Sequence, residues 1–108
     1  MSNMPEETKR KEMYLKSHQH GAHTLIAVCD CDILGKKFKE GHLKIEVSPD
    51  FFAGEKASRS DVEAALAAAT MANFVGSKTV EHAISLGYVE RDFVLSIDGV
   101  LYAQMVRM

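Results

Sequence analysis

Turn signals near both ends of the chain constrain the fold more than any other feature of the sequence. Asp98-Gly99 separates two apolar runs, DFVLSI and VLYAQMVRM, and an Asp-Gly pair in such a place is the strongest short signal for a two-residue β-hairpin. At the other end, Gly21 can take a positive φ between segments 13–19 and 23–30, which read as two strands. The chain is therefore predicted to begin and end with antiparallel hairpins.

Between these hairpins the sequence predicts two helices. Ser60 to Phe74 is the clearer one, because Ser60 and Glu63 form a capping-box pattern and the interior AALAAATMA consists of strong helix formers. The second helix is expected to start at Ser77, which can cap it, and to run to about Leu86. The two segments together predict a packed helix pair.

A third strand is predicted at 42–47, where HLKIEV alternates between apolar and polar residues before Ser48-Pro49 breaks the run. The expected order is thus hairpin, strand, helix pair, hairpin. This order predicts the α+β class, with a mainly antiparallel sheet and the two helices on one face.

Length and charge narrow the classes of function. A chain of 108 residues suits one domain, expected at 13–108, after a flexible polar tail at 1–12. The chain has no apolar run of membrane-spanning length and no secretory signal, so a cytoplasmic protein without membrane contact is predicted. The net charge of −2 disfavours a dedicated binder of duplex DNA.

Several short stretches carry a resemblance to a known family. They are MYLK at 13–16, AVCD at 27–30, LGKKF at 34–38, ANFVG at 72–76 and GVLYAQMVRM at 99–108. In these the chain resembles a small archaeal family described only as a domain of unknown function, number 424. The resemblance implies an archaeal cytosolic protein. Members of that family usually carry His at the position where this chain has Tyr102. It implies no activity and no functional residues.

Cysteines and histidines cluster in the first hairpin. Cys29 and Cys31, with His18 and His20 nearby, are the weak candidates for a metal site, because thiolates and imidazoles are zinc ligands. Their spacing matches none of the strong zinc patterns. We therefore expect no metal and no cofactor, with Cys29 buried in a central strand and the other three residues at the surface. A small enzyme or metal-binding protein built around Cys29 and Cys31 stays open as an alternative.

Catalytic signatures give no positive indication. The sequence contains no GxGxxG, no GxxxxGK[ST], no HExxH and no GxSxG. Asp30 and Asp32 alternate with the cysteines, but two carboxylates hold Mg²⁺ only with further partners, so a strand end entering a loop is the expected structure. No catalytic residue is predicted, and a non-enzymatic protein is favoured.

The most suggestive functional feature is a basic segment. GKKFKEG at 35–41 is expected to be a loop or a single helical turn, and residues 35–44 carry four lysines against one glutamate, a net charge of +3. Lysines contact phosphates and aromatic rings stack on unpaired bases, although Phe38 could equally anchor the loop in the core. The tentative nucleic-acid-binding residues are Lys36, Lys37, Phe38, Lys39 and Lys44.

The leading hypothesis is a non-enzymatic accessory protein that associates with RNA or with a ribonucleoprotein. A second hypothesis is a protein-interaction module or homodimer, which would associate through an exposed strand edge.

Overall fold

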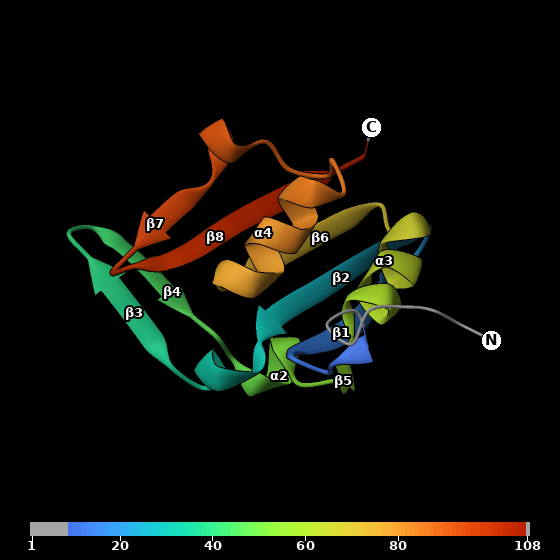
Figure 1. The fold of residues 1–108 in the computed structure, drawn as a ribbon, viewed down its shortest axis with the longest axis horizontal. Helices are drawn as coiled ribbons and strands as arrows, with labels where there is room; N and C mark the ends of the chain where they lie inside the picture. Colours follow the sequence, from blue (N-terminus) through green and yellow to red (C-terminus); the bar gives the residue numbers. More distant parts are fainter. Residues whose placement is uncertain (1–8, 108) are drawn as a thin grey trace.

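The computed structural model describes residues 9–107, and the fold is α+β with a mostly antiparallel sheet (Figure 1). Its strands are β1 (Met13–His20), β2 (His23–Asp30), β3 (Lys37–Glu40), β4 (Leu43–Glu46), β5 (Glu55–Ala57), β6 (Met71–Val75), β7 (Leu95–Ile97) and β8 (Val100–Val106). Its helices are α2 (Pro49–Phe52), α3 (Arg59–Ala67) and α4 (Ser77–Ser85), with 3-10 turns η1 (Cys31–Ile33) and η2 (Arg91–Phe93). Within this range no helix has the length and hydropathy needed to cross a membrane.

Six strands form the central sheet in the order β5-β1-β2-β6-β8-β7. Neighbouring strands run antiparallel except β2 and β6, which are parallel. A parallel pair requires a crossover connection, and here that connection contains α2, β5, α3 and a separate two-stranded sheet of β3 and β4.

Both hairpins predicted at the chain ends are present. β1 and β2 pair up to His20 and His23, and Gly21 in the turn has φ +59°. β7 and β8 pair up to Ile97 and Val100, and the Asp98-Gly99 turn has positive φ at both positions. Positive φ at both central residues defines the type I′ turn, whose twist matches that of the flanking strands.

The predicted helix at 60–74 is wrong in its second half. α3 ends at Ala67, and MANFV forms strand β6 between β2 and β8. Phe74 in β6 is completely buried, and the strand bonds to a neighbour on each side. Tertiary pairing on both edges thus overrides a local preference for helix, which is a weak determinant on its own.

The capping box also lies two residues earlier than predicted. Ser58 Oγ accepts a hydrogen bond from the Asp61 N–H at 3.2 Å, and Asp61 Oδ2 accepts one from the Ser58 N–H at 3.0 Å. Ser58 directly follows β5 and has extended backbone angles, as an N-cap residue requires. The Ser60–Glu63 pattern is therefore not the cap.

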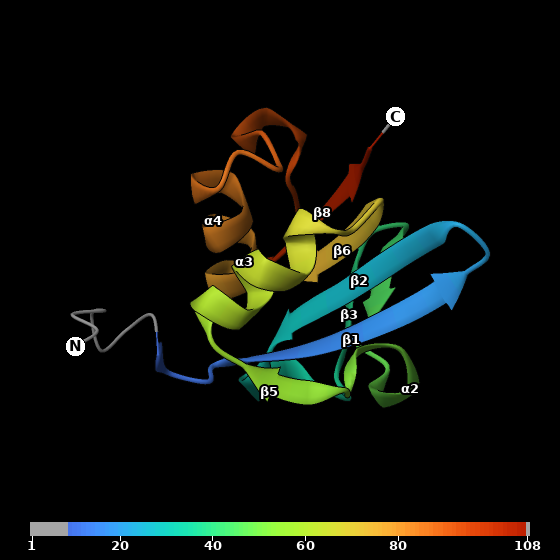
Figure 2. The same ribbon diagram turned by 90° about the vertical axis from the view of Figure 1, so that its right-hand side faces the viewer.

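Both longer helices cover the same face of the central sheet (Figure 2), but β6 separates them in the chain, so they do not form the predicted helix pair. Val62 and Leu66 of α3 share one buried cluster with Val80 and Ala83 of α4. Each pair is three or four residues apart, a spacing that places both side chains on one side of a helix. Together with apolar residues of β1, β2, β6 and β8, they form the helix-side core.

The opposite face of the sheet is covered by α2 and by the β3–β4 hairpin. Its buried cluster consists of Ala27, Cys29, Val47, Phe52 and Val75. We call this smaller cluster the hairpin-side core.

The third strand predicted at 42–47 exists as β4, but it does not join the central sheet. It pairs only with β3, which occupies part of the segment predicted as a loop or helical turn. Gly41 has φ +61° in the turn between the two strands. The apolar alternation of 42–47 continues across the turn, because Phe38 lies opposite Ile45 and both pack against the hairpin-side core.

Candidate nucleic-acid interface

Four lysines lie on or beside the β3–β4 hairpin, and we call them the lysine face: Lys36, Lys37, Lys39 and Lys44. All four are exposed, and none forms an ion pair within residues 9–107. Lys39 lies directly opposite Lys44 in the strand register. Like charges directly opposite each other destabilise a strand pair. An anionic partner bound at this face would relieve the repulsion between the two ammonium groups.

The other face of the hairpin is directed toward the protein. Side chains alternate along a strand, so Phe38 and Glu40 point away from Lys37 and Lys39. Phe38 is half-buried against the hairpin-side core, which places its ring in an anchoring position.

The one acid of the basic segment is already engaged. Glu40 Oε1 accepts a hydrogen bond from the Asp98 N–H at 2.7 Å, which ties the hairpin to the β7–β8 turn. The other carboxylate of the hairpin is that of Glu46, which lies opposite Lys37 in the strand register.

A cleft of about 340 Å³ lies between the hairpin and the central sheet. Its lining comes from β4, α2, β6, β7 and β8: Leu43, Lys44, Ile45, Glu46, Phe51, Phe52, Asn73, Leu95, Ile97 and Tyr102. Sequence reasoning missed this cleft, because its walls come from segments some 60 residues apart and no local pattern connects them.

A short chain of polar side chains begins in the cleft. Gln104 Nε2 donates a hydrogen bond to Asn73 Oδ1 at 3.0 Å across the β6–β8 pair. Burial raises the pKa of the Tyr102 hydroxyl above its usual value, and a side-chain hydrogen bond with Gln104 opposes that rise. Tyr102 therefore stays protonated at neutral pH, and its hydroxyl can donate a hydrogen bond.

Within residues 9–107, neither cysteine belongs to a group of side chains that could hold a metal ion. Cys29 is completely buried in β2, and burial, reinforced by the charge of Asp30, raises the pKa of its thiol to about 12. Because the thiolate is the metal ligand and nucleophile, this thiol is inert at neutral pH. Cys31 lies in η1, where its Sγ–H donates to the Lys11 carbonyl at 3.9 Å and burial raises its pKa.

The two histidines proposed as weak metal candidates also have other surroundings. His18 stacks on Phe51 with ring centroids 4.7 Å apart, and its Nε2–H donates to the Phe51 carbonyl at 2.8 Å. His20 is exposed at the end of β1. Across residues 9–107, no three His, Cys, Asp or Glu side chains come together in a way that could hold a metal ion.

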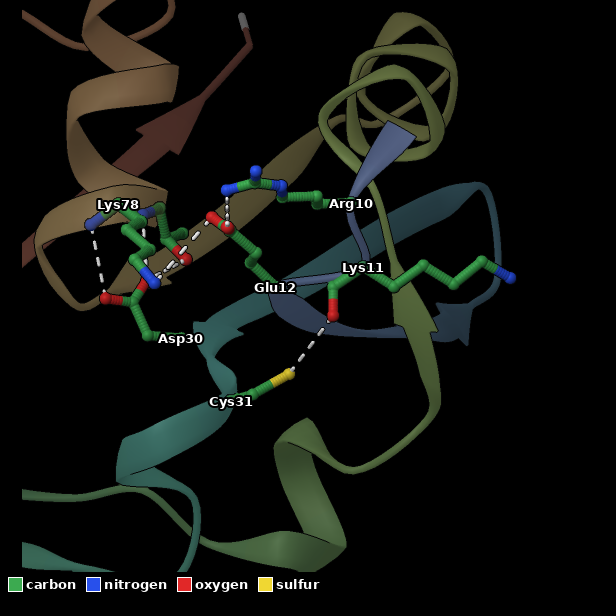
Figure 3. A network of polar contacts seen from close by, with 7 residues as sticks. Arg10, Lys11, Glu12, Asp30, Cys31 and Lys78 are labelled. Atoms are coloured by element: carbon green, nitrogen blue, oxygen red, sulfur yellow. Dashed lines mark hydrogen bonds and ion pairs between the residues drawn. The ribbon is translucent and has the colours of Figure 1, made fainter. Parts of the chain in front are cut away.

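Asp30 does more than end a strand. Its Oδ1 accepts hydrogen bonds from the Thr79 N–H at 2.9 Å and the Thr79 hydroxyl at 2.8 Å, and its Oδ2 accepts one from the Lys78 N–H at 3.2 Å (Figure 3). This carboxylate accepts hydrogen bonds from backbone N–H groups in the first turn of α4, which is the capping role predicted for Ser77. The N-cap position is occupied by Gly76 at φ +106°, where an added Cβ would lie 2.3 Å from Asp30 Cγ.

The segment just before β1 contacts the same junction. The Glu12 carbonyl accepts a hydrogen bond from the Cys31 N–H at 3.0 Å, and the Glu12 carboxylate lies 3.7 Å from Lys78 Nζ and 3.9 Å from Arg10 (Figure 3). Contacts with the domain thus begin before Met13, where the domain was predicted to start. The rest of the predicted tail, residues 1–8, lies outside the described residues.

Comparisons with known proteins agree with this architecture. The fold is similar to the crystal structure of an uncharacterized conserved protein from Methanopyrus kandleri, with a TM-score of 0.72 and 20% sequence identity. The similarity covers 89% of this chain and 94% of that one, and at this identity it establishes the fold alone. The comparison with curated proteins yields no match. A family model described as protein of unknown function (DUF424) matches residues 18–108, and the chain therefore belongs to the DUF424 family.

Proposed function

We propose that this chain binds single-stranded RNA, alone or within a ribonucleoprotein, through the lysine face. The observation that carries the proposal is the pair of like charges, Lys39 opposite Lys44, on a hairpin where Glu40 is engaged by the Asp98 N–H and Glu46 lies opposite Lys37. Four exposed ammonium groups on a two-stranded ribbon can follow a phosphate backbone. The overall charge of −2 favours a local contact of this kind over the broad basic surface of a duplex-DNA binder.

The salt dependence of binding tests this proposal. With about four phosphate contacts, the log–log slope of affinity against salt for single-stranded RNA should be near −3, from roughly −0.7 per contact. Replacing Lys36 and Lys37 together by Ala should make the slope shallower by about 1.4. The slopes are measured by fluorescence anisotropy of a labelled oligoribonucleotide across a salt series.

A matched control separates the hairpin from general charge. Lys11→Ala with Lys56→Ala removes the same charge from exposed positions on and near β5, the edge strand of the sheet opposite β7. This control pair should leave the slope unchanged. If the unmodified protein does not bind at low salt, or if both double variants change the slope equally, the proposal fails.

A second candidate function is self-association or partner binding through the β7 edge. β7 pairs only with β8, and Phe93 and Leu95 beside that free edge are 75% and 46% exposed. An apolar free edge can accept another strand. Sedimentation equilibrium should then show a concentration-dependent mass that Phe93→Lys abolishes, whereas a constant monomer mass would dismiss this candidate.

A further inference from the structure

The cleft has the size and chemistry of a site for a small planar ligand. Its volume of about 340 Å³ lies at the lower end of the range typical of ligand pockets, roughly 300–1,000 Å³. Three aromatic side chains line it, namely Phe51, Phe52 and Tyr102. Phe51 and Phe52 meet edge to face, with ring centroids 5.0 Å apart, so two rings of different orientation are held together on α2.

Asn73 and Tyr102 bring hydrogen-bonding groups from the central sheet to the cleft. Asn73 accepts a hydrogen bond from Gln104 through Oδ1, which leaves its amide nitrogen without a partner in residues 9–107. Tyr102 lies on the adjacent strand β8, two residues before Gln104, the register partner of Asn73, and its protonated hydroxyl also interacts with Gln104. Aromatic walls with a few orienting polar groups are the features by which proteins hold an unstacked base.

The cleft and the lysine face share a residue. Lys44 belongs to the lysine face and also lines the cleft, so a strand whose phosphates follow the lysines passes the mouth of the cleft. Lys44 and Glu46 of β4 both line the cleft, so the aromatic walls and the Asn73 donor, and not the charge of the rim, favour a nucleic-acid base as the occupant.

We propose that the cleft receives one unpaired base of the single-stranded RNA whose phosphates contact the lysine face. This inference rests on the proposed RNA binding and extends it by a base-binding site. The base lies among Phe51, Phe52 and Tyr102, and the Asn73 amide and the Tyr102 hydroxyl meet its polar edge.

The test compares two ligands that have the same backbone. One is a hexamer of oligouridylate, and the other is the same ribose-phosphate backbone with every base removed. The oligomer with bases should bind at least about fivefold more tightly, the lower end of what stacking one base on aromatic side chains contributes. It should also shift the backbone amide resonances of Asn73, Ile97 and Tyr102, whereas the abasic backbone should shift only those of residues 36–44.

Two variants locate the effect in the cleft. Tyr102→Leu keeps an apolar side chain and removes the ring and the hydroxyl. Asn73→Ala removes the unused donor, and because Asn73 is only half-buried, this substitution should disturb folding less than one in the core. Each should reduce the advantage of the oligomer with bases while leaving the salt slope unchanged. Ser96→Ala is the matched control, because Ser96 lies between two cleft residues of β7 but points to the other face of the sheet.

The outcomes separate the two proposals. Equal affinity for both ligands, with the salt slope of the lysine face retained, would overturn the base-binding inference and leave the RNA-binding proposal standing. Absence of binding by either ligand at low salt would overturn both. Retention of the full advantage in Asn73→Ala and Tyr102→Leu would place the base outside the cleft.

Discussion

On one face of the central sheet lie α3 and α4 (Figure 2), and the core beneath them completely buries Phe74, Leu66 and Val80, whereas on the other face α2 and the β3–β4 hairpin cover a smaller buried cluster. The same strands supply both faces, since successive side chains of a strand alternate. The helix-side core includes residues of both longer helices and of four central strands. The hairpin-side core contains fewer fully buried residues, and beside it lie the cleft and the lysine face.

This difference suggests that one face mainly stabilises the fold and that the other face presents groups for binding. A packed helix layer supplies the apolar burial that stabilises a domain. A short hairpin supplies less, but it carries groups that a closed core would exclude, such as exposed lysines. Binding surfaces are commonly drawn from such less stable parts of a fold. The two faces should therefore respond differently to substitution.

The largest effect is expected in the helix-side core. Phe74→Ala should lower the free energy of unfolding by about 3–5 kcal/mol, because a completely buried aromatic ring is replaced by a cavity in the middle strand of the sheet. Urea denaturation followed by circular dichroism measures this loss. A loss below about 1 kcal/mol would show that this face is not the main source of stability.

A smaller effect is expected at the junction of β2 with α4. Asp30→Ala should cost about 1–3 kcal/mol, because it removes the acceptor of the buried Thr79 N–H and hydroxyl. Asp30→Asn keeps a carbonyl oxygen at this position and should cost less. Thermal unfolding of both variants provides the comparison, and equal losses would mean that the carboxylate acts through its charge.

The hairpin face should yield a smaller and more local effect. Phe38→Ala should cost about 1–2 kcal/mol, less than full burial of an aromatic ring contributes, because Phe38 is only half-buried. Hydrogen exchange should accelerate in β3 and β4 while β2 and β6 stay protected. If Phe38→Ala keeps full stability but binds RNA more weakly, the ring stacks on a base and does not anchor the hairpin.

The smallest effect on stability is expected at the lysine face itself. Lys36→Ala with Lys37→Ala should change the free energy of unfolding by no more than about 0.5 kcal/mol, since both side chains are exposed and form no ion pair within residues 9–107. The melting temperature from differential scanning calorimetry measures this. A large loss would give these lysines a structural role and would remove the basis for using them as a binding test.

The parts of the fold that could be predicted from sequence are those with local causes. The Asp98-Gly99 turn requires positive φ, and Gly21 permits it, so both terminal hairpins were predictable. The inward positions Val62 and Leu66 follow from helical spacing. The basic segment was equally visible, since charge is a property of composition.

The errors arise where distant segments compete with local preference. The helix-forming stretch at 60–74 was divided because β6 fills the place between β2 and β8, where it bonds on both edges. Ser77 lost its predicted capping role because Asp30, 47 positions earlier in the chain, reaches the first turn of α4. Neither partner is identifiable from the residues beside it.

The sequence by itself determined the fold class, the two terminal hairpins and the presence of four lysines around one turn, because turn chemistry, periodicity and charge act over a few residues. Only the tertiary structure decided that these lysines lie on a separate ribbon, that Phe38 points inward and that Lys44, Asn73 and Tyr102 border one cleft. Such juxtapositions depend on strand order and on which side of a sheet each element packs, and long-range contacts set both.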